Sequence, residues 1–427
     1  MSRVVCVPPD LLPADLDRSI DYFAVFRSSG RGEVSRVGTG LIDDVVRAGF
    51  SPSTRAWDFA TFALAVSAAD LAVVRNQSVD GWTRMLELQV ALVEPEPFTL
   101  LAPRLEKMLR FLTGDYWRLS FIEGGTPAPR APRKFLRRYD ADCVSLLSGG
   151  MDSLVGGIDL IRAGSRPLFV SQMAKGDSET QVEYARRLGA SERHIQWNHN
   201  IQVAHTTERS TRGRSIVFFA FAILAADQLQ QQGLADVTVV VPENGFISLN
   251  VPLNAGRVGS LSTKTTHPVF LDELESIWRE LELHATFERP YAYKTKGELA
   301  VECADRVLLA ELVGRSTSCG RFGYYNYTHC GRCVPCLVRR SSFIRAGLTD
   351  STSEYHFPSL RTAGRKTGAN DIGAVAAAVL RHEAQGVRRL TGGQLTFAPP
   401  TARRAYEDVV ARGLAELGTL LRREGVL

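Results

Sequence analysis

The sequence predicts an α/β domain built on a parallel sheet, preceded by an α+β domain and followed by helices. In the middle of the chain, apolar runs of strand length alternate with helix-length segments, as in a parallel sheet with crossover helices. The runs are Cys143–Leu147, Pro167–Val170, His194–Trp197 and Val237–Val241. A stretch rich in Pro and Arg precedes them, and amphipathic segments follow. We therefore expect a domain at 1–125, a linker at 126–139, the sheet domain at 140–347 and a helical extension at 348–427.

The composition is ordinary for a globular protein. Of the 427 residues, 44% are hydrophobic and 23% are charged, which excludes wholesale disorder, collagen and coiled coil. The net charge of +5 is mild and does not by itself require a nucleic-acid partner. The longest apolar run, Ile216–Ala226, falls well short of the ~20 residues of a membrane helix. Met1–Asp10 also lacks a signal-peptide core, so we expect a cytoplasmic protein with no membrane segment.

Residues 1–125 show helix and strand patterns but no catalytic constellation. Ser53–Val74 is rich in Ala, Phe and Leu and predicts a helix, whereas Arg84–Val93 alternates apolar and polar side chains as a strand does. Leu100–Leu112 predicts a second helix, and Asp115–Phe121 a second strand. We expect this α+β domain either to bind a partner protein or to cap the sheet of the next domain.

The first strand of the central domain leads directly into a glycine-containing loop. The loop reads Ser148-Gly149-Gly150-Met151-Asp152-Ser153, and the helical segment Leu154–Arg162 follows it. Glycines let the backbone fold closely around an anion, and the N–H groups and dipole of a helix start favour negative charge there. The two serines add hydroxyl donors. A carboxylate is unusual in an anion cradle unless it holds Mg²⁺ or orients a reacting group.

This loop resembles the SGGxDS pyrophosphate loop of the PP-loop ATP pyrophosphatase superfamily. Those enzymes cleave ATP between the α and β phosphates and transfer AMP to a substrate oxygen. The resemblance implies ATP and Mg²⁺ as cofactors, catalytic roles for Ser148, Asp152 and Ser153, and ATP contacts along the whole loop. It also implies ATP contacts from Lys175, after the second strand, and from Arg214 and Ser215 at a helix start. Ser215 equally suits a helix N-cap, and both interpretations stay open.

Four of the seven cysteines lie close together near the end of the central domain. They are Cys319, Cys330, Cys333 and Cys336. Four thiolates complete a tetrahedral Zn²⁺ site with no open position, which indicates a structural role. Iron–sulfur ligation uses similar runs, but the separated first cysteine favours zinc. His329 is a possible substitute ligand, and the three isolated cysteines are expected to be buried free thiols.

The pyrophosphate loop followed by this cysteine knuckle resembles QueC, the 7-cyano-7-deazaguanine synthase family, over residues 140–347. Long segments flank the shared part, as in the QueC-like proteins of bacterial antiphage islands, which the chain resembles and which include QatC of the Qat system. The resemblance also covers the Lys-rich turn at 294–298. Polar loops after the fourth strand, and this turn, offer candidate contacts for a purine-like substrate with a carboxylate; ordinary polar turns are the alternative. The candidates are Glu243, Asn244, Lys264, Thr266, His267 and Lys294.

The sequence supports three functional hypotheses. The first is an ATP-dependent ligase of antiphage defence that adenylates 7-carboxy-7-deazaguanine and forms an amide with the N-terminal amine of a partner protein. The second is the nitrile synthase reaction with ammonia. The third is an RNA-binding scaffold with a degenerate loop, because residues 361–427 hold 11 Lys and Arg against 6 Asp and Glu. Amphipathic helices at Ile372–Gln385 and Arg403–Arg423 give that tail a simpler explanation. The family resemblance also implies a homodimer.

Overall fold

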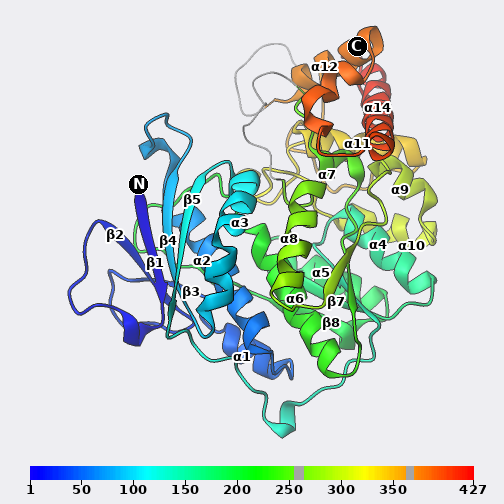
Figure 1. Ribbon diagram of the computed structural model, residues 1–427. Coiled ribbons are helices and arrows are strands. Elements are labelled where there is room, and N and C mark those ends of the chain that lie inside the picture. Colours follow the sequence, from blue (N-terminus) through cyan, green and yellow to red (C-terminus); the bar gives the residue numbers. More distant parts are fainter. Residues whose placement is uncertain (254–263, 362–369) are drawn as a thin grey trace.

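The computed structural model describes residues 1–253, 264–361 and 370–427, and these form two parallel sheets with a helical C-terminal part (Figure 1). Each sheet has five strands, in the orders β3-β2-β1-β4-β5 and β10-β9-β6-β7-β8. The predicted fold class is confirmed. Among the described residues none of the helices has both the length and the apolarity needed to cross a bilayer.

The N-terminal sheet is parallel throughout its recorded strand pairs. Its elements are β1 (Ser2–Val7), β2 (Ile20–Val25), β3 (Ser35–Val37), α1 (Leu41–Arg47), α2 (Thr54–Ala72), β4 (Met85–Leu92), α3 (Pro95–Thr113) and β5 (Tyr116–Glu123). The sequence had predicted the four elements from α2 onward but not β1 to β3. Because the pairing is parallel and helices connect β3 with β4 and β4 with β5, this unit is α/β in character; the α+β description is corrected on this point.

The central sheet places the glycine loop at the point where the strand order reverses. Its strands are β6 (Cys143–Leu146), β7 (Pro167–Gln172), β8 (His194–Trp197), β9 (Val237–Val240) and β10 (Ala285–Glu288). The helices of this part are α4 (Met151–Arg162), α5 (Ser178–Arg187), α6 (Ser215–Gln231), α7 (Gly245–Leu249), α8 (Pro268–Glu280), α9 (Lys296–Glu302), α10 (Arg306–Leu312) and α11 (Val334–Ala346). β6 pairs with β7 on one side and with β9 on the other. The strand that follows β7 in sequence, β8, lies beyond β7, and the strand that follows β9, β10, lies beyond β9 at the opposite edge of the sheet. Ligands of open α/β sheets bind at such a switch point.

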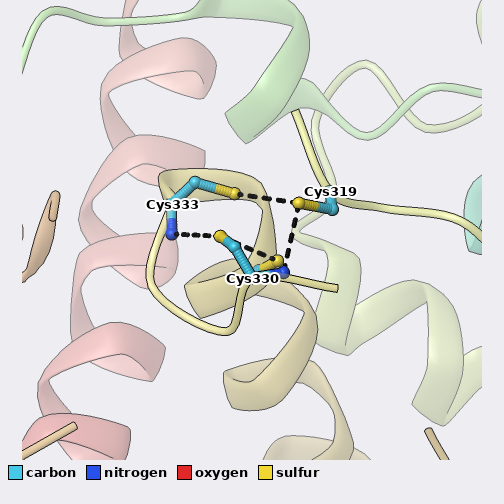
Figure 2. A group of neighbouring side chains, drawn as sticks. Cys319, Cys330 and Cys333 are labelled. Atoms are coloured by element: carbon cyan, nitrogen blue, oxygen red, sulfur yellow. Dashed lines mark hydrogen bonds between the residues drawn. The ribbon is translucent and has the colours of Figure 1, made fainter. Parts of the chain in front are cut away.

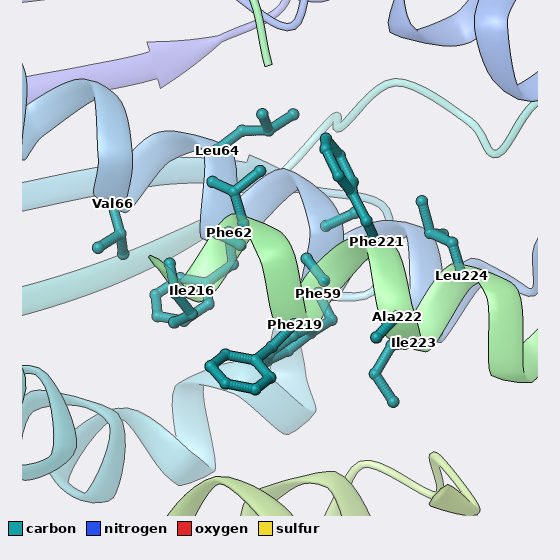
Figure 3. Close-up of a cluster of buried hydrophobic side chains, with 14 of the residues drawn as sticks. Phe59, Phe62, Leu64, Val66, Ile216, Phe219, Phe221, Ala222, Ile223 and Leu224 are labelled. Atoms are coloured by element: carbon teal, nitrogen blue, oxygen red, sulfur yellow. The ribbon is translucent and has the colours of Figure 1, made fainter. Parts of the chain in front are cut away.

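Two helices lie between the sheets and join them into one apolar core. Nearly every residue of α2 and of the first three turns of α6 is buried, as expected for helices covered on all sides. Phe59 and Phe62 of α2 and Phe219 and Phe221 of α6 belong to one buried apolar cluster (Figure 3). The core is continuous across both sheets, so the division at 126–139 stays a proposal about folding units.

A buried group of charges fastens the N-terminal unit to the central one. Arg84 donates hydrogen bonds to Asp70 and, at 2.7 Å, to Asp115, and Arg75 binds Asp115 through two bonds of 2.7 and 2.8 Å. Asp70 also accepts the backbone N–H groups of Arg212 and Gly213, at 2.5 and 2.6 Å. Arg212 and Gly213 lie just before α6. The N-terminal unit therefore fixes the approach to that helix.

The long loop between β8 and α6 is also attached to the N-terminal sheet. Arg36 of β3 and Gln202 exchange two backbone hydrogen bonds of 2.8 Å, which extends the edge of that sheet in the antiparallel sense. Further along the loop, Glu208 accepts from the N–H of Arg75 at 2.7 Å. The loop thus behaves as part of the N-terminal unit rather than as a free connection.

The C-terminal helices form a second apolar core against the central domain. They are α12 (Ile372–Gln385), α13 (Arg388–Thr391) and α14 (Pro400–Arg423). Val409, Val410, Leu414 and Leu417 of α14 are fully buried in this core. The predicted amphipathic helices are therefore present, and α14 also packs on α11, α7 and α9. In Figure 1 this part lies at the top of the molecule.

Replacing Asp70 by Asn should destabilise the protein by about 3–5 kcal/mol, the cost typical of breaking a buried charge pair. The amide cannot accept from an arginine and two backbone N–H groups at once, so at least one buried donor loses its partner. The free energy of unfolding from chemical denaturation measures the effect. Arg279→Gln, in an exposed pair with Glu275, is the control and should change it by less than about 0.5 kcal/mol. Equal effects of the two variants would contradict this role for Asp70.

Candidate active site and metal centre

The glycine loop has the form of an anion cradle. Gly149 has φ of +88°, a conformation that favours glycine, and the chain turns there from β6 into α4. The N–H of Gly150 donates to the Ser148 hydroxyl at 3.3 Å, and the Ser153 hydroxyl donates to the Gly150 carbonyl at 3.0 Å. The two serine oxygens lie 3.2 Å apart. Met151 is fully buried, so only its backbone can take part in the cradle.

Asp152 lies at the centre of a buried polar cluster behind this loop. Its carboxylate forms an ion pair with Lys296 and accepts the side-chain amide of Asn244 at 2.6 Å and the Asn244 backbone N–H at 3.2 Å. These three residues are each more than nine-tenths buried. Burial raises the pKa of Asp152, but the Lys296 charge and the surrounding hydrogen bonds outweigh it and hold that pKa below its ordinary value.

Glu243 completes the cluster with the opposite protonation behaviour. Burial, followed by the neighbouring Asp152 carboxylate, raises the pKa of Glu243 well above its ordinary value. The raised pKa favours the protonated form of Glu243, beside an Asp152 that Lys296 holds in its ionised form. Two carboxyl groups with pKa values displaced in opposite directions, beside a lysine, are typical of a functional site. Of the predicted substrate contacts, Glu243 and Asn244 belong to this cluster.

Lys296 is a candidate site residue that the sequence interpretation missed. The Lys-rich turn was recognised, but Lys294 was named as the candidate. Lys294 instead pairs with Glu302 at 2.6 Å near the surface. A capping box supplies the missing signal, because Thr295 accepts from the Glu298 N–H at 3.1 Å and Glu298 accepts from the Thr295 N–H at 2.9 Å. That pattern is visible in the sequence and places Lys296, but not Lys294, inside a helix.

The other predicted ATP contacts lie on the loops beside the cradle. Arg214 precedes α6, where burial lowers its pKa and the Asp177 charge opposes that shift. Ser215 is the first residue of α6 but does not cap it, and its buried hydroxyl has no hydrogen-bond partner among the described residues. A buried hydroxyl without a partner is uncommon and is consistent with a bound ligand there. The Lys175 ammonium lies 4.9 Å from the centre of the Tyr327 ring.

Of the remaining predicted substrate contacts, Lys264 and His267 lie in a different cavity, whereas Thr266 lines a small cavity together with Glu243. The cavity of Lys264 and His267 has a volume of about 370 Å³ and lies between α3, the end of α7 and the C-terminal part. His267 caps α8 by accepting the Val269 N–H at 3.2 Å, and burial lowers its pKa to about 4. The Thr266 carbonyl accepts the Ser248 hydroxyl. Capping and turn formation thus account for His267 and Thr266.

The four cysteines gather into one buried cluster. Their sulfur atoms lie within 4.8 Å of one another, which suits a single tetrahedral Zn²⁺ ion. Figure 2 shows three of them, Cys319, Cys330 and Cys333. Backbone N–H groups point at the sulfurs: those of Arg332 and Cys333 donate to Cys330 at 3.4 and 3.2 Å, and that of Cys330 donates to Cys319 at 3.3 Å. Such donors stabilise thiolates. With four protein ligands no position is left for substrate, so the site suits structural zinc.

His329 is outside the metal cluster found among the described residues. Its Nε2 accepts the Ser318 N–H at 3.2 Å, and burial lowers its pKa to about 4. This neutral ring supports the chain just before Cys319. The Thr317 N–H, two residues earlier than Cys319, donates to the Gly149 carbonyl at 3.0 Å. The knuckle is therefore tied directly to the anion cradle.

Cys330→Ser should remove the metal, because a hydroxyl is a far weaker zinc ligand than a thiolate and a three-cysteine site is incomplete. Elemental analysis of the purified protein should show a fall from about one zinc per chain to near zero. Cys143→Ser is the matched control, since Cys143 is a buried free thiol in β6, and it should keep its zinc. Zinc retained by Cys330→Ser would exclude the proposed ligand set.

The chain is similar to the 7-cyano-7-deazaguanine synthase of Agrobacterium fabrum, with 29% identity over 159 residues. The match covers 36% of this chain and 58% of that relative, so it spans a little under three fifths of the relative's length. No family model and no solved structure matches the chain. The similarity indicates a distant relationship over this part of the chain.

Proposed function

We propose that this protein is an ATP-dependent ligase that adenylates the carboxylate of 7-carboxy-7-deazaguanine and then forms an amide. The observation that carries the proposal is the anion cradle at the switch point with the Asp152–Lys296–Glu243 cluster behind it. Strand-to-helix loops of this kind bind phosphate through backbone N–H groups. The similarity to 7-cyano-7-deazaguanine synthase supports the substrate class.

The cradle suits the phosphates of ATP. The free N–H groups at the start of α4 and the hydroxyls of Ser148 and Ser153 would hold the β and γ phosphates. Arg214, Ser215 and Lys175 stand on the neighbouring loops, where the rest of the nucleotide would lie. The carboxyl oxygens of Asp152 and Glu243 fit Mg²⁺, which when bound would neutralise charge on the departing pyrophosphate. In that state Glu243 would be ionised.

The proposed reaction has two steps. A carboxylate oxygen of the substrate attacks the α-phosphorus, the bond to the β-phosphate oxygen breaks, and pyrophosphate leaves with the electron pair. An amine then attacks the acyl carbon, AMP leaves, and the amine gives up a proton as the amide forms. Donors fixed at the start of α4 stabilise the charge that develops on pyrophosphate without rearranging. Zinc bound by the four cysteines would stabilise the knuckle, which the Thr317 N–H ties to Gly149, and would take no part in either step.

A cavity beside the knuckle offers room for the acyl acceptor. It has a volume of about 490 Å³ and lies between the loop at 209–211, α7 and the cysteine turn. Arg209, Arg321 and Phe246 are among its lining residues, which combine charge with an aromatic surface. We propose that the N-terminal amine of a partner protein enters here, as in the QatC-like proteins of antiphage defence. The N-terminal unit, which holds the 198–214 loop, would shape this entrance.

The principal alternative is nitrile synthesis with ammonia, the reaction named for the bacterial relative. A second ATP would then activate the amide for dehydration. An RNA-binding role is less favoured, because arginines of the tail are engaged by acids of the same chain. Arg422 pairs with Glu383 and Arg388 with Glu407, at 2.6 and 3.1 Å. None of the seven cysteines, all of which lie in the described part of the chain, forms a disulfide, and we place the reaction in the reducing cytoplasm.

Lys296→Met should reduce pyrophosphate release by about 100-fold or more, because it leaves the buried Asp152 charge without its partner. Lys294→Met is a matched control two residues away. It removes a surface ion pair, and the rate of pyrophosphate release should stay within about twofold of that of the unchanged protein. A coupled pyrophosphate assay with ATP and 7-carboxy-7-deazaguanine measures both. Equal rates for the two variants would refute the site assignment.

The identity of the acceptor can be decided by mass spectrometry of the products. Ligation to protein predicts that a co-expressed neighbouring protein gains the mass of a 7-deazaguanine amide at its N-terminus. The gain should vanish with Asp152→Ala in the enzyme. A free nitrile formed from ammonia, with no modified protein, would instead establish the synthase alternative.

A further inference from the structure

We propose that Arg412 and Glu416 of α14 are positioning residues that hold the turn carrying Lys296 against Asp152. The inference rests on the proposed function, in which the Asp152–Lys296 pair supports adenylation. It concerns the C-terminal extension, a part of the chain that the chemistry itself does not use. The helix would then act as a clamp on the active site.

The contacts from α14 fall on both sides of Lys296. Arg412 donates through Nε to Glu298 at 2.6 Å and through Nη2 to the Tyr293 carbonyl at 2.7 Å. One guanidinium therefore spans the turn from three residues before Lys296 to two residues after it. Such a fork is rigid and fixes the relative position of the two groups it binds.

Glu416 binds the same turn one helical turn further along α14. Its carboxyl accepts the hydroxyl of Thr295, the N-cap of α9. Thr295 also accepts the N–H of Glu298. Both residues of the capping box, Thr295 and Glu298, therefore form hydrogen bonds with side chains of α14. The cap satisfies N–H groups that α9 would otherwise leave without partners at its start. Lys296 is the first residue of that helix.

The approach of α14 is close enough to require glycine at position 297. A methyl group on Gly297 would come within 2.6 Å of a Glu416 carboxyl oxygen and of the Arg345 side chain. The turn, α14 and α11 are therefore in direct contact, with no room for a side chain between them. Glycine immediately after Lys296 lets the helix press against the turn.

A small displacement of this turn would affect the site strongly. Lys296 is 7% exposed and its ammonium reaches the buried carboxylate of Asp152, which has no other cation recorded against it among the described residues. A misplacement of about 1 Å is enough to reduce a reaction about 100-fold. If the clamp is lost, the start of α9 frays and Lys296 can withdraw toward water. Asp152 then loses its partner although neither residue has changed.

The test compares Arg412→Ala and Glu416→Ala with the conservative Arg412→Lys and Glu416→Gln in the full chain. Each alanine variant should lower kcat for pyrophosphate release by about 10- to 100-fold and leave the KM for ATP within about twofold. Each conservative variant should recover part of the loss. Arg388→Ala, an exposed arginine of the same extension, is the control and should keep the kcat of the unchanged protein. An Arg412→Ala protein with unaltered kcat overturns the proposal.

Coupling to Lys296 separates positioning from general support of the fold. In a Lys296→Met background, Arg412→Ala should have no further effect on the residual rate, because both changes remove the same interaction. Additive losses would show that Arg412 acts elsewhere and overturn the proposal. Hydrogen exchange gives a readout free of the substrate: Arg412→Ala should speed exchange of the amides of α9. If the unchanged protein released no pyrophosphate, the proposed function would fail. Unaltered hydrogen exchange of the α9 amides in Arg412→Ala would separately overturn the clamp.

Discussion

The need to neutralise one buried carboxylate organises the active-site half of this structure. Asp152 lies at the start of α4, directly behind the anion cradle, where an unpaired charge would be costly. Lys296 supplies the opposite charge, and Asn244 and Glu243 supply hydrogen bonds. These partners come from the loop after β9 and from the start of α9. The pair therefore brings together segments nearly 150 positions apart along the chain.

A second constraint fixes the other wall of the site. The chain approaching α6 passes over Asp70, which binds two successive backbone N–H groups there. The N-terminal sheet also takes up the loop after β8 as an additional edge. Arg214 and Ser215, two of the predicted ATP contacts, follow directly in the sequence. Through these contacts the N-terminal unit forms a structural wall of the central domain.

The sequence predicted the elements that carry a strong local pattern. β8 and α12 have the bounds expected of them, and the cradle lies between a strand and a helix as its glycines required. β1 to β3 and β10 were missed, since short strands buried by distant partners have little periodicity of their own. His267 was assigned to substrate although its place before Pro268 suits a helix cap. Choosing between Lys294 and Lys296 required the capping box to be weighed together with the charge of Asp152.

The continuous core has a consequence for how the protein gains and loses its structure. α2 and α6 belong to different predicted domains, yet each covers the other from water. Neither sheet would retain its buried surface alone, so the two halves should melt in one cooperative transition rather than in two. A chain nicked in the exposed connection near Lys134 would hold together as an associated pair of fragments.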